Sequence, residues 1–155
     1  MKKSANGNMY EVPARETAEL FRSHLDGSDL PLLCVLSGAP LPERARAALS
    51  SSARALGYPD DAVAFITLEG PDGRLDASSV LLAMEGLDPA CAVAADADAA
   101  HALSQAYRCA VPEGECSRVM GRSIVAFASF DALLDDGRSK QRAWALLKKL
   151  PKLGG

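Results

Sequence analysis

The sequence lacks a long apolar segment and a strong excess of either charge. No apolar run approaches the roughly 20 residues of a membrane span, and nothing near Met1 has the pattern of a signal peptide. We therefore expect no membrane association. Lys and Arg number 17 against 20 Asp and Glu, and the isoelectric point is near 5.4. This balance excludes a uniformly basic nucleic-acid coat.

The cysteines lack the spacing of a disulfide framework. Cys34 and Cys91 lie within apolar runs, where Cys acts as a small hydrophobe, and no C-x-x-C pair is present. Cys109 and Cys116 flank the turn-rich residues 111–114, where a disulfide, half of a metal site or two free thiols would fit. We favour free thiols in a cytoplasmic protein, and we expect no metal and no cofactor.

Four short apolar runs alternate with segments of helical periodicity, and together these make up most of the chain. The predicted strands cover residues 30–36, 62–67, 91–94 and 123–127. The predicted helices cover residues 13–25, 43–56, 76–85, 97–108 and 130–134, with a last helix capped by Ser139 that runs to about Leu150. This alternation predicts a three-layer α/β/α domain with a four-stranded parallel sheet. We assign residues 1–12 to a frayed or disordered end, 13–150 to the domain and 151–155 to a tail.

Ligands of such folds bind beyond the carboxyl ends of the strands. The first connection contains Ser37 and Gly38, which predict either an anion site or a structural turn. Glu69, after the second strand, is the best-placed candidate for a catalytic carboxylate, and its alternative is a solvated loop acid. Asp96 and Ser129 have the sequence context of helix caps, and Asp98 and Asp131 that of first-turn acids. Neither His24 nor His101 is placed for catalysis.

The order of elements and the last part of the chain carry a family resemblance. Ala-Leu-Leu at 132–134 precedes Lys140, Trp144, Leu147 and Lys148, while Leu-Ser-Gly-Ala-Pro spans 36–40, Phe-Ile-Thr spans 65–67 and Leu-Asp-Pro spans 87–89. Over residues 30–150 this pattern resembles the uracil-DNA glycosylase superfamily, in particular its cluster-bearing bacterial and archaeal members. The resemblance implies their fold and a DNA-handling ancestry.

The residues that work in this family are replaced. The acidic or polar group of the first motif falls on Gly38, the base-reading Asn on Leu68, and the His-Pro-Ser segment on residues 129–131. The four cysteines do not match the cluster ligands, so we expect no iron–sulfur cluster. Excision needs an extruded base held at its edge and stabilisation of the charge that develops on it. We therefore predict that the fold is retained and that uracil excision is lost.

The predicted role is a binding or interaction module with a DNA or protein partner. The ligand-binding candidates are Ser37, Gly38, Leu68, Glu69, Ser129 and Asp131. One alternative is a divergent enzyme acting on DNA bases or nucleotides through Glu69, Asp96 or Asp131.

The other alternative is a non-catalytic DNA-binding protein. All acidic residues precede residue 137, whereas residues 137–155 contain six basic ones. This end is either a solvated helix face or a nucleic-acid edge that includes Arg138, Lys148 and Lys149.

Overall fold

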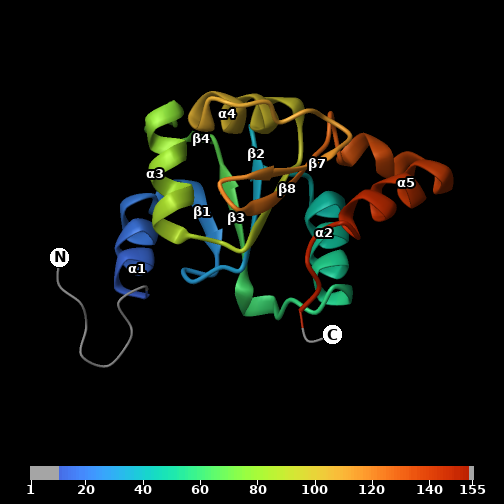
Figure 1. Ribbon diagram of the computed structural model, residues 1–155, viewed down its shortest axis with the longest axis horizontal. Coiled ribbons are helices and arrows are strands. Elements are labelled where there is room, and N and C mark those ends of the chain that lie inside the picture. Colours follow the sequence, from blue (N-terminus) through green and yellow to red (C-terminus); the bar gives the residue numbers. More distant parts are fainter. Residues whose placement is uncertain (1–10, 154–155) are drawn as a thin grey trace.

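Four parallel strands form the centre of the sheet (Figure 1). The computed structural model describes residues 11–153. The strands β2 (Leu33–Ser37), β3 (Val63–Thr67), β6 (Cys91–Ala94) and β8 (Arg122–Ala126) lie in the order β3-β2-β6-β8. They coincide with the four apolar runs, which are buried because helices cover both faces of the sheet. The predicted α/β class is confirmed.

The prediction of a four-stranded sheet is wrong, because the sheet has six strands. β1 (Leu25–Gly27) pairs antiparallel with β3, and β7 (Cys116–Val119) pairs antiparallel with β8. Both are short edge strands, partly exposed, and β1 consists of Leu-Asp-Gly. An edge strand has one neighbour only, so it needs no continuous apolar run and leaves little periodic signal.

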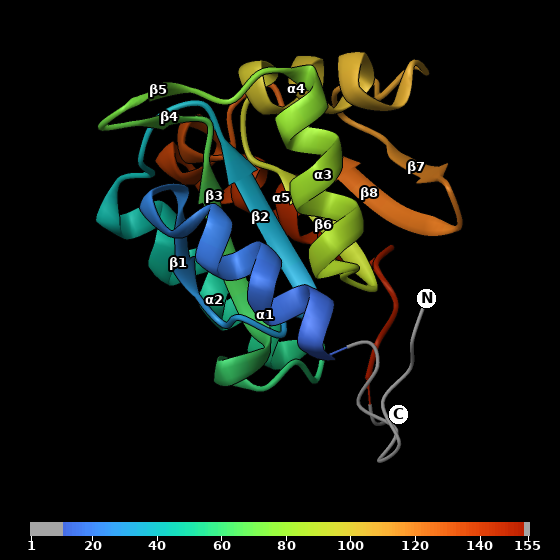
Figure 2. The same cartoon turned by 90° about the vertical axis from the view of Figure 1, so that its left-hand side faces the viewer.

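The helices divide between the two faces of the sheet (Figure 2). α1 (Glu11–Leu20), α3 (Ala77–Leu87) and α4 (Ala97–Tyr107) share one core with the sheet, whereas α2 (Glu43–Ala55) and α5 (Gly137–Leu147) share the other. The chain passes from β2 through α2 to β3 and then crosses back over β2 to β6. Because both crossovers keep the same hand, this reversal places α2 and α3 on opposite faces. No helix of the described residues is both long and apolar enough to cross a bilayer.

Two of the predicted helix caps are confirmed, whereas the predicted cap of α5 is wrong. The Asp76 and Asp96 carboxylates accept hydrogen bonds at 2.8 Å from the backbone N–H groups of Ser79 and Ala99. α5 is capped by Asp136 rather than Ser139, whose own N–H donates to the Asp136 carboxylate at 2.8 Å. The helix therefore begins three residues before the predicted start, because Asp136 takes the cap position in place of Ser139.

The predicted ends of the domain also need correction. α1 begins at Glu11, inside the segment 1–12 assigned as frayed, because Ala14 and Ala18 pack into the core; residues 1–10 lie outside the described part. The helix stops at Leu20, short of the predicted residue 25. At the other end, the Leu153 N–H donates to the Leu56 carbonyl at 2.9 Å. The first part of the predicted tail is thus fixed to the end of α2, and residues 154–155 lie outside the described part.

All four cysteines are free thiols. Cys34 and Cys91 are buried in the sheet, as their apolar context predicts, whereas Cys109 is exposed and Cys116 is half-buried. Burial raises the pKa of Cys34 to about 12, which keeps this thiol protonated and unreactive.

Arg122 is the one buried arginine among the described residues, with 7% of its side chain exposed at the start of β8. Its guanidinium donates at 2.8 Å to the carboxylates of Glu85 and Asp88 and to the Pro89 carbonyl, and at 3.0 Å to the Tyr107 hydroxyl. These partners lie at the carboxyl ends of α3 and α4, so Arg122 ties both helices to the sheet.

Replacing Arg122 by Leu removes this tie and leaves the Pro89 carbonyl and the Tyr107 hydroxyl without their donor. We expect Arg122→Leu to lower the free energy of unfolding by about 2 kcal/mol, measured by urea denaturation. The control is Arg118→Leu on the neighbouring strand, an exposed arginine in no ion pair of the described residues, with an expected change within about 0.5 kcal/mol. Equal effects of the two substitutions would contradict the assigned role.

Candidate functional site

The carboxylate of Asp96 joins the ends of two adjacent parallel strands. It receives the Gly38 backbone N–H at 3.0 Å from Oδ2 and 3.2 Å from Oδ1, while Oδ1 also receives the Ala99 N–H at 2.8 Å. Gly38 follows β2 and Asp96 follows β6, which lie side by side where the strand order reverses. This is the crevice in which open α/β sheets bind ligands. The Asp96 carboxylate thus already accepts the backbone N–H groups of Gly38 and Ala99, which a bound anion would otherwise use.

Gly38 leaves no room for a side chain. A Cβ atom at this position would collide with the carboxyl group of Asp98, which reaches over from the first turn of α4. A side chain at position 38 would therefore fit only after the Asp98 carboxyl, the end of a half-exposed flexible side chain, moves aside. Asp98 fills the space that a polar side chain at position 38 would occupy.

A short hairpin covers the same edge of the sheet. It consists of β4 (Glu69–Gly70) and β5 (Gly73–Arg74), and the Arg74 guanidinium hydrogen-bonds to the Asp98 carboxylate and lies 3.7 Å from the Glu69 carboxylate. Glu69, the predicted catalytic candidate, therefore stands beside an arginine, with 60% of its side chain exposed. The connection between the predicted strand 62–67 and the predicted helix 76–85 thus contains a hairpin whose Arg74 forms ion pairs with Glu69 and Asp98.

Asp131, the second catalytic candidate, is held by α2. The Arg44 Nε donates to its Oδ1 at 2.8 Å, and Arg44 Nη2 donates to the Asp131 carbonyl at 2.9 Å and to Asp135 at 2.9 Å. Hydrogen bonding to this guanidinium lowers the pKa of the Asp131 carboxyl, so the group is ionised at neutral pH.

The other predicted ligand-binding residues make structural contacts. Leu68 is fully buried in the core, and Ser37 is buried, with its carbonyl accepting the Leu68 N–H at 2.9 Å. Ser129 Oγ accepts the Ala132 N–H at 3.2 Å just before the 3₁₀ turn η3 (Asp131–Asp135), but the residue at the N-cap position of this turn is Phe130 rather than the predicted Ser129. The six candidates all lie at the carboxyl edge, but each polar contact they make is internal.

Sequence reasoning missed Arg44 and Arg74, the partners of the two acidic candidates. It also placed His24 in a helix, whereas the residue belongs to the 3₁₀ turn η1 (Arg22–His24) and its Nδ1 lies 2.8 Å from the Thr67 carbonyl at the end of β3. No local signal identifies these partners, because 87 residues separate Arg44 from Asp131 and 43 separate His24 from Thr67. Among residues 11–153, no three His, Cys, Asp or Glu side chains gather to hold a metal ion.

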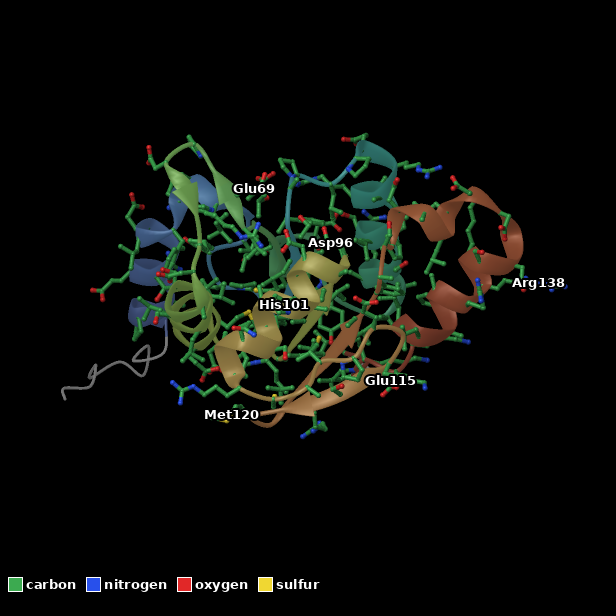
Figure 3. The ribbon with its side chains drawn as sticks, turned by 90° about the horizontal axis from the view of Figure 1, so that it is seen from above. Glu69, Asp96, His101, Glu115, Met120 and Arg138 are labelled. Atoms are coloured by element: carbon green, nitrogen blue, oxygen red, sulfur yellow. The ribbon has the colours of Figure 1, made fainter. Side chains whose placement is uncertain are left out.

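The predicted basic residues belong to a different region. Figure 3 shows Glu69 and Asp96 near the middle of the molecule, whereas Arg138, at the start of α5, lies at its right-hand edge. Arg138, Lys148 and Lys149 are exposed, and within the described part none of them forms an ion pair. The sequence candidates thus form two separate sites, a closed carboxyl edge and an open basic end.

The close approach of Asp98 to Gly38 is directly testable. We expect Gly38→Ala to lower the free energy of unfolding by about 1 kcal/mol, because the added methyl group displaces the half-exposed Asp98 carboxyl and its ion pair with Arg74. Asp98→Ala removes that carboxyl, so the same substitution in the Asp98→Ala background should cost less than half as much. A double-mutant cycle followed by urea denaturation measures the difference. An equal cost in both backgrounds would show that the collision does not limit position 38.

No family model and no curated protein matches this sequence. The resemblance to uracil-DNA glycosylases accordingly rests on the residue patterns alone and stays a prediction.

Proposed function

We propose that the chain is a glycosylase-like α/β domain that does not excise uracil and serves as a binding module. The observation that carries the proposal is the closed carboxyl edge, where Asp96 takes the Gly38 N–H and Asp98 fills the space beside Gly38. Leu68, at the position expected to read the base, is fully buried and has no polar side-chain atom. Between Gly38 and Leu68, an extruded base would find neither free space nor side-chain hydrogen-bonding groups for its edge.

The acidic candidates are also unsuited to glycosidic bond cleavage. The leaving base becomes anionic, so the site must supply positive or hydrogen-bond-donating groups. Asp131 is an ionised carboxylate bound to Arg44, and it would bring negative charge to that position. Glu69 and Asp98 face Arg74, which leaves that arginine already engaged.

The test is a panel of oligonucleotides that carry uracil, hypoxanthine or an abasic site. We expect no base release and no strand cleavage above the protein-free reaction, because Asp96 and Asp98 occupy the space beside Gly38 and Leu68 cannot hydrogen-bond to a base. An active uracil-DNA glycosylase on the same substrates serves as the positive control. Base release that Glu69→Gln or Asp131→Asn abolishes would overturn the proposal.

A second candidate function is non-catalytic DNA binding by the basic end. One observation favours it: in the described part of the chain, none of the six cations after residue 136 pairs with an acid. They are Arg138, Lys140, Arg142, Lys148, Lys149 and Lys152. Unneutralised cations are what phosphate contacts require.

This candidate predicts a DNA affinity that falls steeply with salt concentration, because phosphate contacts release counterions. Lys148→Glu combined with Lys149→Glu should then weaken binding and flatten the salt dependence. The matched control is Arg15→Glu with Arg108→Glu, two exposed arginines in α1 and at the end of α4, on the opposite face of the sheet. Fluorescence anisotropy with single-stranded and duplex DNA provides the measurement, and equal losses in both double variants would count against a specific basic edge.

A further inference from the structure

α2 and α5 lie on the same side of the sheet (Figure 1). Side chains of both helices line a groove between them. Its volume is about 410 Å³, and we call it the α2–α5 groove. Phe130, Leu134, Ala143 and Leu147 provide apolar lining. Leu134 is half-buried, whereas the other three belong to the buried core. The groove therefore offers apolar surface without opening the core.

The α5 wall of the groove combines cations with the one tryptophan of the chain. Lys140 and Trp144 line it, and Lys148 follows one turn further along the helix. Residues four apart share one helix face, so the three side chains form a cation–aromatic–cation stripe. The Lys148 Nζ lies 5.8 Å from the centre of the Trp144 ring. Neither lysine forms an ion pair with any described acid.

The α2 wall of the groove presents no unpaired cation. Arg44 lines the groove but is held by Asp131 and Asp135 at 2.8 and 2.9 Å. Uncompensated positive charge is thus confined to the α5 side. A complementary ligand carries its negative charge on the side that faces α5. Its apolar groups face the apolar lining of the groove.

We propose that the α2–α5 groove binds an acidic amphipathic peptide segment of a partner protein. The inference rests on the proposed binding role and names the partner class. Apolar side chains of the segment lie against Leu134 and Trp144, and its carboxylates face Lys140 and Lys148. An amphipathic helix supplies this division of faces, with anchors spaced three and four residues apart.

The structure favours this occupant over the chain's own ends. Residues 1–10 contain two lysines and no acid, so they do not complement the lysines of α5. The carboxyl-terminal segment is engaged elsewhere, since Tyr58 donates to the Pro151 carbonyl at 2.6 Å and Leu153 is bonded to the end of α2.

A nucleic acid fits the groove less well than a peptide. Its backbone carries a charge at every nucleotide, and Asp131 and Asp135 stand on the α2 side. Proteins that bind single strands without sequence preference stack the bases on several exposed aromatic side chains. Of the two aromatic residues that line the groove, Phe130 is buried and only Trp144 is partly exposed. A peptide can instead place uncharged residues beside these acids.

The single tryptophan provides a local readout, because Trp144 fluorescence reports on the groove alone. The probe is a Trp-free synthetic peptide of about 14 residues, built from Glu, Asp, Leu and Phe with its apolar residues on one helical face. We expect a saturable blue shift of Trp144 emission as the peptide covers the ring. A peptide of equal charge with Ser in place of Leu and Phe should bind at least 10-fold more weakly.

Protein variants separate groove binding from general charge attraction. Lys140→Glu should weaken peptide binding about 10-fold, whereas the matched reversal Arg15→Glu on the opposite face should change it less than 2-fold. Circular dichroism checks that both variants fold. Absence of a saturable shift, equal binding of the Ser-substituted peptide, or equal losses in the two variants would each overturn the proposal.

Two further outcomes would also overturn it. One is tighter binding of a single-stranded oligonucleotide than of the peptide at the same salt concentration. The other is self-association of the protein, measured by sedimentation, that protects Trp144 without peptide. Failure of the groove proposal stays distinguishable from failure of the proposed function, because base release from the oligonucleotide panel is measured separately and depends on the carboxyl edge.

Discussion

The hydrogen bonds of the Asp96 carboxylate join the carboxyl ends of two central strands to the start of α4. A single carboxylate receives the N–H of Gly38 after β2 and the N–H of Ala99 in α4, and so joins two strand ends. This contact sets the start of α4, which in turn brings Asp98 over Gly38 and within reach of Arg74. The position at which related architectures bind ligands is thus occupied by the chain's own charged groups.

The carboxyl edge of the sheet and helix α5 differ in whether their charged side chains are paired. At the carboxyl edge, Glu69, Asp98 and Asp131 each face an arginine, and these pairs satisfy most of the polar groups that a ligand would need. Along α5 the lysines face no described acid and stand beside apolar surface and Trp144. Exposed ion pairs contribute little to stability. Their effect here is to neutralise the acidic groups of the carboxyl edge, whereas the lysines of α5 pair with no described acid.

The parallel core and the helix caps were predictable because their signals are local. A strand buried on both faces needs a continuous apolar run, as in residues 91–94, and an Asp before a helix accepts an N–H three residues later, as Asp76 and Asp96 do. The edge strand β1 has no such signal, since it pairs through its backbone and stays partly exposed. The cap of α5 was misplaced because Asp136 and Ser139 are both suitable residue types and only the structure distinguishes them.

The sequence by itself determined the order of strands and helices, the burial of the central strands, and the asymmetry of charge between residues 137–155 and the rest. Those properties depend on neighbouring residue types and on periodicity. The tertiary structure alone decided which charges are neutralised, since 58 residues separate Gly38 from Asp96 and 87 separate Arg44 from Asp131. Hydrogen bonds and ion pairs form only within a few ångströms. Whether a candidate carboxylate is a free group or a partner in an ion pair is therefore settled by the fold, which brings distant residues to one edge.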